Sequence, residues 1–220
     1  SSIWGQLTAV GSTLFFAAND GTNGVELWKS DGTELGTILV KDSNPGSAYS
    51  TPSDLLAIGS TLYFVATDAA GGREVWKSDG TEGGTVPVAD VVPGAAGSSP
   101  SRLLALGSNL VFFANDGVHG LEPWISDGSE PGTHMVDDFN PGTGNGVDAT
   151  LLPKVVGGVL YLAIDNGTSG FDPWVSDGTA GGSSRIADLA VGEGDGRLPS
   201  YESASFGAAD GGSELVSLAS

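Results

Sequence analysis

Short apolar runs alternate with polar segments rich in glycine along most of the chain. The first set of runs predicts strands at 7–10, 13–19, 25–29 and 37–41. Gly-Ser and Asp-Gly dipeptides link these strands, and because such links form tight turns, neighbouring strands should be antiparallel. The second run, Leu14-Phe15-Phe16-Ala17, is apolar at consecutive positions, which indicates a strand buried on both faces. The pattern predicts an all-β protein whose sheets are covered on both sides.

The same set of runs repeats. Four tryptophans recur at spacings of 48, 48 and 50 residues, and each stands in a similar phrase: ELWKSDGTELGT, EVWKSDGTEGGT, EPWISDGSEPGT and DPWVSDGTAGGS. A period of this length is typical of propeller repeats, in which each unit forms one four-stranded sheet. Stacking such sheets face to face around an axis buries both faces of each.

We therefore predict one β-propeller domain over 1–220, built from four-stranded antiparallel blades. The blades are expected at 7–54, 55–102, 103–150 and 151–198, with a fifth at 199–220 that residues 1–5 close by adding a strand. The fifth unit is incomplete, because Val216 stands where the tryptophan is expected and the sequence stops before a fourth strand. Two alternatives stay open: a piece of a longer array, or two unfinished rings that complete each other as a dimer.

Composition narrows the classes of partner. The chain has 27 acidic and 8 basic residues and a formal charge of −19, which would repel the phosphate backbone of nucleic acids. No apolar run approaches the roughly 20 residues of a membrane-spanning helix, so we expect no membrane insertion. The absence of cysteine excludes disulfide and thiol chemistry.

Three acidic residues per repeat are predicted to meet at one edge of each sheet. This edge carries the end of the second strand, the start of the third and the end of the fourth. Carboxylates beside glycine-rich loops could bind Ca²⁺, which takes six to eight oxygen ligands. The alternative is structural: the aspartates cap turns, and the glutamate pairs with a lysine or a buried amide. The candidate calcium ligands are Asp20, Glu26, Asp42, Asp68, Glu74, Asp90, Asp116, Glu122, Asp138, Asp165, Asp172 and Asp188.

The recurring tryptophans are the candidate ligand-binding residues, because an aromatic face beside carboxylates could stack against a sugar. The alternative is that each fills the space between neighbouring blades. These residues are Trp28, Trp76, Trp124 and Trp174. The aspartates of the SDGT-type turns are expected on the opposite edge, with a role in turn geometry. His119 and His134 do not recur, and we predict surface positions for both.

The phrases ELWKSDGTELGT and KDSNPG resemble the ELWxxDGT repeat family of bacterial secreted and surface proteins, also described as hyalin-like. The resemblance covers most of the chain and fades after about Asp188. It implies an extracellular or cell-surface repeat protein with a role in adhesion or recognition, and it brings no catalytic residues. In size and blade number the chain also looks like small five-bladed propeller lectins such as tachylectin-2.

We therefore expect a binding module for glycans or a surface protein, with sites repeated around the ring. An alternative is an adhesive building block that self-associates by exchanging strands, since an unpaired strand edge accepts a strand from a neighbour. The chain would accordingly be a monomer or a homo-oligomer. A third hypothesis is a glycosidase, because some propellers use paired carboxylates to hydrolyse glycosidic bonds. Without long insertions that could form a catalytic pocket, the sequence predicts that the chain is not an enzyme.

Overall fold

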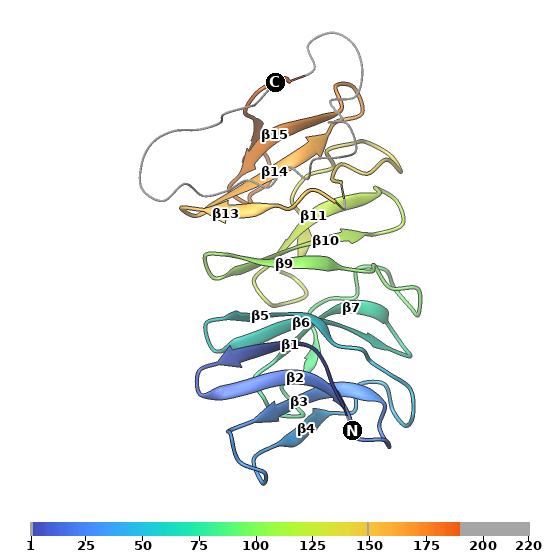
Figure 1. Ribbon diagram of the computed structural model, residues 1–220. Helices are drawn as coiled ribbons and strands as arrows, with labels where there is room; N and C mark the ends of the chain where they lie inside the picture. Colours follow the sequence, from blue (N-terminus) through green and yellow to red (C-terminus); the bar gives the residue numbers. More distant parts are fainter. Residues whose placement is uncertain (1, 149, 190–220) are drawn as a thin grey trace.

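The computed structural model describes residues 2–148 and 150–189, which form strands and connections without a helix. The strands make four antiparallel sheets of four strands each, in chain order (Figure 1). The first sheet holds β1 (Ser2–Val10), β2 (Thr13–Asn19), β3 (Val25–Ser30) and β4 (Ile38–Lys41), and the second holds β5 (Ser53–Ile58), β6 (Thr61–Asp68), β7 (Gly72–Ser78) and β8 (Val86–Pro87). The third holds β9 (Ser101–Leu106), β10 (Asn109–Asn115), β11 (Leu121–Ser126) and β12 (His134–Met135), and the fourth holds β13 (Lys154–Val156), β14 (Val159–Asp165), β15 (Phe171–Ser176) and β16 (Ser183–Arg185).

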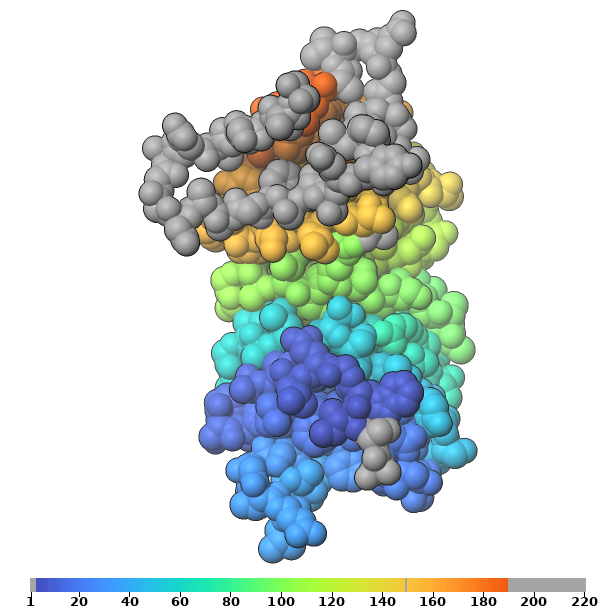
Figure 2. All heavy atoms as spheres, viewed as in Figure 1, coloured from blue at the N-terminus to red at the C-terminus, as the bar shows by residue number. Residues whose placement is uncertain are grey.

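The sheets follow one another as successive layers, with the first sheet at one end of the molecule and the fourth near the other (Figures 1 and 2). This architecture confirms the all-β prediction and the four-stranded antiparallel unit. The strands of the first repeat lie where the apolar runs predict them. A fifth blade at 199–220 falls outside the described residues and stays a prediction. No helix long and apolar enough to cross a membrane occurs in the part of the chain that the structure describes.

The N-terminal residues differ from the prediction. Residues 1–5 were expected to close the fifth blade, but Ser2, Ile3 and Trp4 pair with β2 and extend the first strand of the first sheet. The register shifts between Trp4 and Thr8, and Gly5 supplies a positive φ of 73° at that irregularity. The hairpin partner is adjacent in the chain, whereas closure would need a distant segment and a larger loss of loop entropy.

Three apolar clusters hold the layers together. The first joins Phe15, Leu27 and Val40 of the first sheet to Leu62, Phe64 and Trp76 of the second. Equivalent clusters join the second sheet to the third and the third to the fourth. Both faces of the two middle sheets are therefore covered, as the doubly apolar second strands indicate.

Candidate functional site

The buried acid of each repeat holds the connection to the next sheet. Glu26 is fully buried in β3. Its Oε2 accepts hydrogen bonds from the Ser43 amide at 2.9 Å and the Ser50 hydroxyl at 2.5 Å, and its Oε1 accepts one from the Ser50 amide at 2.9 Å. Since these donors lie in the connection between β4 and β5, the carboxylate stabilises that connection by satisfying its buried amides.

The equivalent glutamates of the next two sheets do the same. Glu74 accepts from the amide and the hydroxyl of Ser98 at 2.6 and 2.5 Å. Glu122 accepts from the Gly146 amide at 2.7 Å, and no hydroxyl stands there because glycine replaces serine. Burial raises the pKa of Glu26 and of Glu74, and it raises the pKa of Glu122 to about 8.

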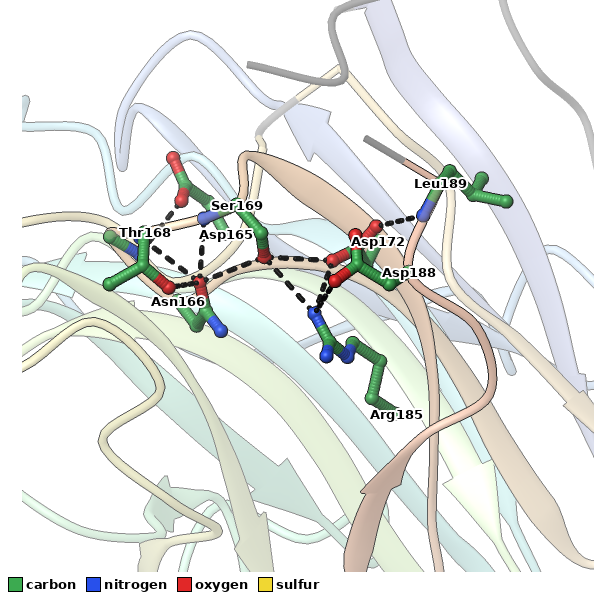
Figure 3. A network of polar contacts seen from close by, with 9 residues as sticks. Asp165, Asn166, Thr168, Ser169, Asp172, Arg185, Asp188 and Leu189 are labelled. Carbon is green, nitrogen blue, oxygen red and sulfur yellow. Dashed lines mark hydrogen bonds and ion pairs between the residues drawn. The ribbon is translucent and has the colours of Figure 1, made fainter. Parts of the chain in front are cut away.

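The fourth sheet departs from this arrangement. Asp172 replaces the glutamate, and Nη1 of Arg185 lies 3.1 Å from its Oδ2 and 3.0 Å from Oδ2 of Asp188 (Figure 3). Ser169 donates its hydroxyl to Asp172 at 2.8 Å, and the Leu189 amide donates at 2.9 Å. Burial by itself raises the pKa of Asp172, but these donors and the guanidinium hold it below its usual value.

The acids at the ends of the second strands cap turns. Asp20 accepts from the amides of Thr22 and Asn23 at 2.8 and 2.9 Å, and Asp68, Asp116 and Asp165 accept from amides in the equivalent turns. The acids after the fourth strands have a separate role, since Asp42 and Asp90 accept from Gly46 and Gly94 at 3.1 and 3.3 Å. These aspartates therefore have the structural role given above as the alternative to calcium binding, and so do the glutamates that accept from buried amides.

A calcium site finds no support in this geometry. Within residues 2–148 and 150–189, no group of three or more His, Cys, Asp or Glu side chains is arranged to hold a metal ion. Ten of these acids instead accept separate hydrogen bonds and Asp188 forms an ion pair with Arg185. For Asp138 no hydrogen bond occurs among the described residues, where its Oδ1 is buried without a partner. Calcium binding therefore stays a prediction from the sequence, without a ligand cluster in the described residues.

The recurring tryptophans contribute to packing. Trp76 is 3% exposed and lies against Phe64 with ring centroids 6.4 Å apart, so it has no free face for a sugar. Trp124 stacks with Phe112, and Trp174 meets Phe139 edge to face. Trp28 is half-buried on the first sheet. The packing alternative accounts for Trp76, Trp124 and Trp174.

The turn aspartates and the histidines also have local roles. Asp31 accepts from the amide and the hydroxyl of Thr33 at 2.9 and 2.7 Å, and Asp79, Asp127 and Asp177 make the same pair of bonds. This confirms the predicted role in turn geometry. His119 is partly exposed and its Nδ1 lies 2.7 Å from Oδ2 of Asp116, which raises the pKa of His119.

A groove of about 280 Å³ lies between the first two sheets, at the edge that carries these turns. Phe15 brings apolar surface to it. Lys29 and Asp79 bring opposite charges to it, and Thr13 and Ser60 bring hydroxyls that make no hydrogen bond within the described residues. Oδ1 of Asp79 accepts both bonds from Thr81, whereas Oδ2 accepts none within the same residues. The lining is completed by Val10, Gly11, Gly59 and Gly80.

Sequence differences between the repeats explain why the first junction has room for this groove. At the second junction Tyr63 replaces Phe15, and its hydroxyl lies against Gly128 of the next turn. At the third junction Leu106 and Ile125 lie against Gly178, where the first sheet has the shorter Val10 and the Lys29 side chain. The groove was not predicted from the sequence, although the smaller Phe15 and Val10 at the positions of Tyr63 and Leu106 could have indicated it.

No protein-family model and no curated protein sequence matches the chain. A solved structure from a study of two prolyl endopeptidases is similar, with a TM-score of 0.54 and 15% identity over 84% of this chain and 26% of that one. A structure of puromycin hydrolase matches with a TM-score of 0.46 and 15% identity, over 84% of this chain and 30% of that one. The endo-arabinase of Bacteroides thetaiotaomicron matches with a TM-score of 0.38 and 14% identity, over 83% of this chain and 77% of that one.

The first of these likenesses shows the fold alone: the sheets are arranged as blades of a β-propeller. The chain spans less than a third of the length of the first two structures. The prediction that the chain is not an enzyme, which rested on the lack of long insertions, is contradicted, because a similar fold occurs in a structure from the study of two prolyl endopeptidases. At 15% identity this likeness assigns no reaction to the present chain.

Proposed function

We propose that the chain is a recognition module that binds a polyhydroxylated ligand, a glycan, in the groove between its first two sheets. The groove carries the proposal. It brings together the Lys29 ammonium, the Asp79 carboxylate and the apolar surface of Phe15. It also holds the hydroxyls of Thr13 and Ser60, which make no hydrogen bond among the described residues. A few convergent polar groups in an apolar pocket are typical of small-molecule sites, and each of these groups can exchange hydrogen bonds with sugar hydroxyls.

The extracellular setting is part of this proposal and rests on the resemblance of the SDGT-type phrases to the ELWxxDGT repeat family. The site differs from the one expected at the tryptophans. It lies on the opposite edge from the buried acids, at the first junction, whereas Tyr63, Leu106 and Ile125 lie against the turn glycines at the other two described junctions.

The test is a glycan array followed by titration calorimetry with the best ligand. Asp79→Asn keeps the turn bond from Thr81 but removes the charge from the groove. Asp127→Asn is the matched control, because it makes the same change in the next turn, where Tyr63 lies against Gly128. We expect Asp79→Asn to weaken binding about tenfold, which corresponds to about 1.4 kcal/mol, and Asp127→Asn to leave it unchanged.

Two outcomes would contradict the proposal: no glycan bound on the array, or equal losses in both variants. The same samples are assayed for new reducing ends. Release of reducing sugar by the wild-type chain would show that it hydrolyses the ligand as well as binding it, and would identify a glycosidase.

A further inference from the structure

Each sheet presents two different faces to its neighbours. One face carries a row across the four strands, which in the first sheet is Thr8, Phe15, Lys29 and Ile38. The other carries a row that contains the recurring tryptophan, which in the second sheet is Phe64, Trp76 and Pro87. We call these the leading face and the tryptophan face. The first junction packs the leading face of the first sheet on the tryptophan face of the second.

The same pairing recurs at the other two junctions. Tyr63 and Val75 on the leading face of the second sheet pack on Leu110 and Phe112 of the third. Val111 and Ile125 of the third sheet pack with Leu160 and Leu162 of the fourth. Three junctions of one kind therefore use a leading face and a tryptophan face in a fixed order.

Two faces are left without a sheet against them in the described residues. The tryptophan face of the first sheet carries Phe16, Trp28 and Leu39. Trp28 and Leu39 are half-buried, and Phe16, although only 6% exposed, belongs to none of the three clusters between sheets. The leading face of the fourth sheet carries the row Lys154, Tyr161, Val175 and Ser184. Figure 1 shows these sheets at opposite ends of the stack.

At each junction, the residue that follows the tryptophan in one sheet contacts the SDGT-type turn of the next sheet. The two uncovered faces could make the same contact. At the first two junctions Lys29 and Lys77 donate to the carbonyls of Gly80 and Gly128 at 2.8 and 2.7 Å. At the third junction Ile125 lies against Gly178 instead. Val175 is the equivalent residue of the fourth sheet, and Gly32 is the equivalent glycine of the first. An apolar residue over a turn glycine is thus a contact that the fold already makes.

We propose that a second copy of this chain docks head to tail, with its tryptophan face on the leading face of the fourth sheet. The contact continues the junction that the chain makes three times within itself. It is heterologous, because each copy uses a different face, so the copies form a closed ring or a longer open assembly. This inference is independent of glycan binding, whose groove lies at the first junction.

The charge of −19 per copy opposes this association, because like-charged copies repel at low ionic strength. Sedimentation equilibrium of the full chain, from 1 µM to 200 µM (roughly the range of weak to moderate self-association), therefore gives the first test. We expect the mass to rise with concentration to at least that of two copies, and the association to tighten between low salt and about 0.5 M NaCl.

Two substitutions separate the faces. Leu39→Asp alters the tryptophan face, Val175→Asp alters the leading face, and Leu35→Asp is the control because Leu35 is 94% exposed in a turn. Circular dichroism and thermal unfolding confirm folding of each. We expect each face variant alone to be monomeric and Leu35→Asp to associate like the wild type. A mixture of the two face variants should form a one-to-one dimer, because each retains the face that the other lacks.

A wild-type monomer at every concentration and salt would overturn the proposal and leave the predicted fifth blade as the cover of these faces. Association that persists in both face variants would also overturn it, because another surface or an exchanged strand would then join the copies. The wild-type measurement keeps this test decisive even where a face variant fails to fold.

Discussion

Lys29 donates a hydrogen bond from Nζ to the carbonyl oxygen of Gly80 at 2.8 Å, across the junction between the first two sheets. The donor lies one residue after the recurring tryptophan, and the acceptor lies in the SDGT-type turn of the following repeat. In the first two repeats, the phrase around the tryptophan thus supplies the donor, and the same phrase of the next repeat supplies the acceptor. Lys77 and Gly128 form the same contact at the next junction.

Replacement of Lys77 by methionine should destabilise the fold by about 1 kcal/mol, because a charge-assisted hydrogen bond to a turn carbonyl is lost while the aliphatic stem remains. Urea unfolding measures this change. Lys154→Met is the control, since Lys154 is exposed on β13, and both variants are compared at a protein concentration low enough to keep the copies apart. Equal effects of the two substitutions would show that the bond between Lys77 and Gly128 contributes nothing.

The raised pKa of Glu122 leads us to expect that the free energy of unfolding declines with rising pH. Its pKa is about 8 in the folded protein against an ordinary 4.5, so between these values the folded state binds a proton that the unfolded state has released. Stability therefore falls as pH rises through this window, by up to about 1.4 kcal/mol per pH unit for one fully shifted group. Glu122→Gln should make the decline between pH 6 and 8 shallower in urea unfolding.

Glu130→Gln is the control for this pH dependence, because Glu130 is exposed in the turn of the same sheet. It should leave the decline as it is in the wild type. An unchanged slope in Glu122→Gln would contradict a proton bound at Glu122 near neutral pH.

Gly120 should not tolerate a side chain. It has a φ of 75°, and a Cβ would collide with the carbonyl of Gly144 in the connection to the next sheet. Gly117 in the same turn has a φ of 85° with open space around it. Gly117→Ala should cost about 1 kcal/mol from the backbone alone, and Gly120→Ala about 2 kcal/mol more from the collision. Thermal or urea unfolding of the pair separates the two contributions, and equal losses would refute the collision.

Arg185→Met should destabilise the fourth sheet at neutral pH by about 1 to 2 kcal/mol, because the buried Asp172 carboxylate loses its cation. This loss is smaller than for a fully buried ion pair, because the Arg185 side chain is 35% exposed and solvent screens its charge. The pKa of Asp172 is lowered in the fold, so its contribution is present above the unfolded pKa and lost as pH falls through the folded value. The destabilisation should therefore shrink in acid, and a loss independent of pH would point to packing.

The groove should close when Phe15 is replaced by tyrosine, because the Tyr63 hydroxyl at the equivalent place lies against the turn glycine of the next sheet. We expect Phe15→Tyr to abolish glycan binding in calorimetry without loss of thermal stability. The reverse change, Tyr63→Phe, leaves the first groove intact and should leave its affinity unchanged. Full binding by Phe15→Tyr would move the site elsewhere.

The strands could be predicted from the sequence because their signals are local. The expected 13–19 coincides with β2, and 25–29 differs from β3 by one residue. The roles of the turn acids followed from the same kind of signal, since Asp20 and Asp31 bond to amides two or three residues away. Residues 2–4 were misassigned because they match no repeat, so the sequence held no register to place them.

The sequence by itself determined the repeat, the four-stranded unit and the burial of both strand faces, because each depends on residues close in the chain. Only the tertiary structure decided which groups the buried acids contact. Glu26 bonds with Ser43 and Ser50, and the spacing of charges along a chain does not reveal such distant amides. The groove also needed the structure, since it depends on how the Phe15 and Gly80 of two neighbouring sheets meet.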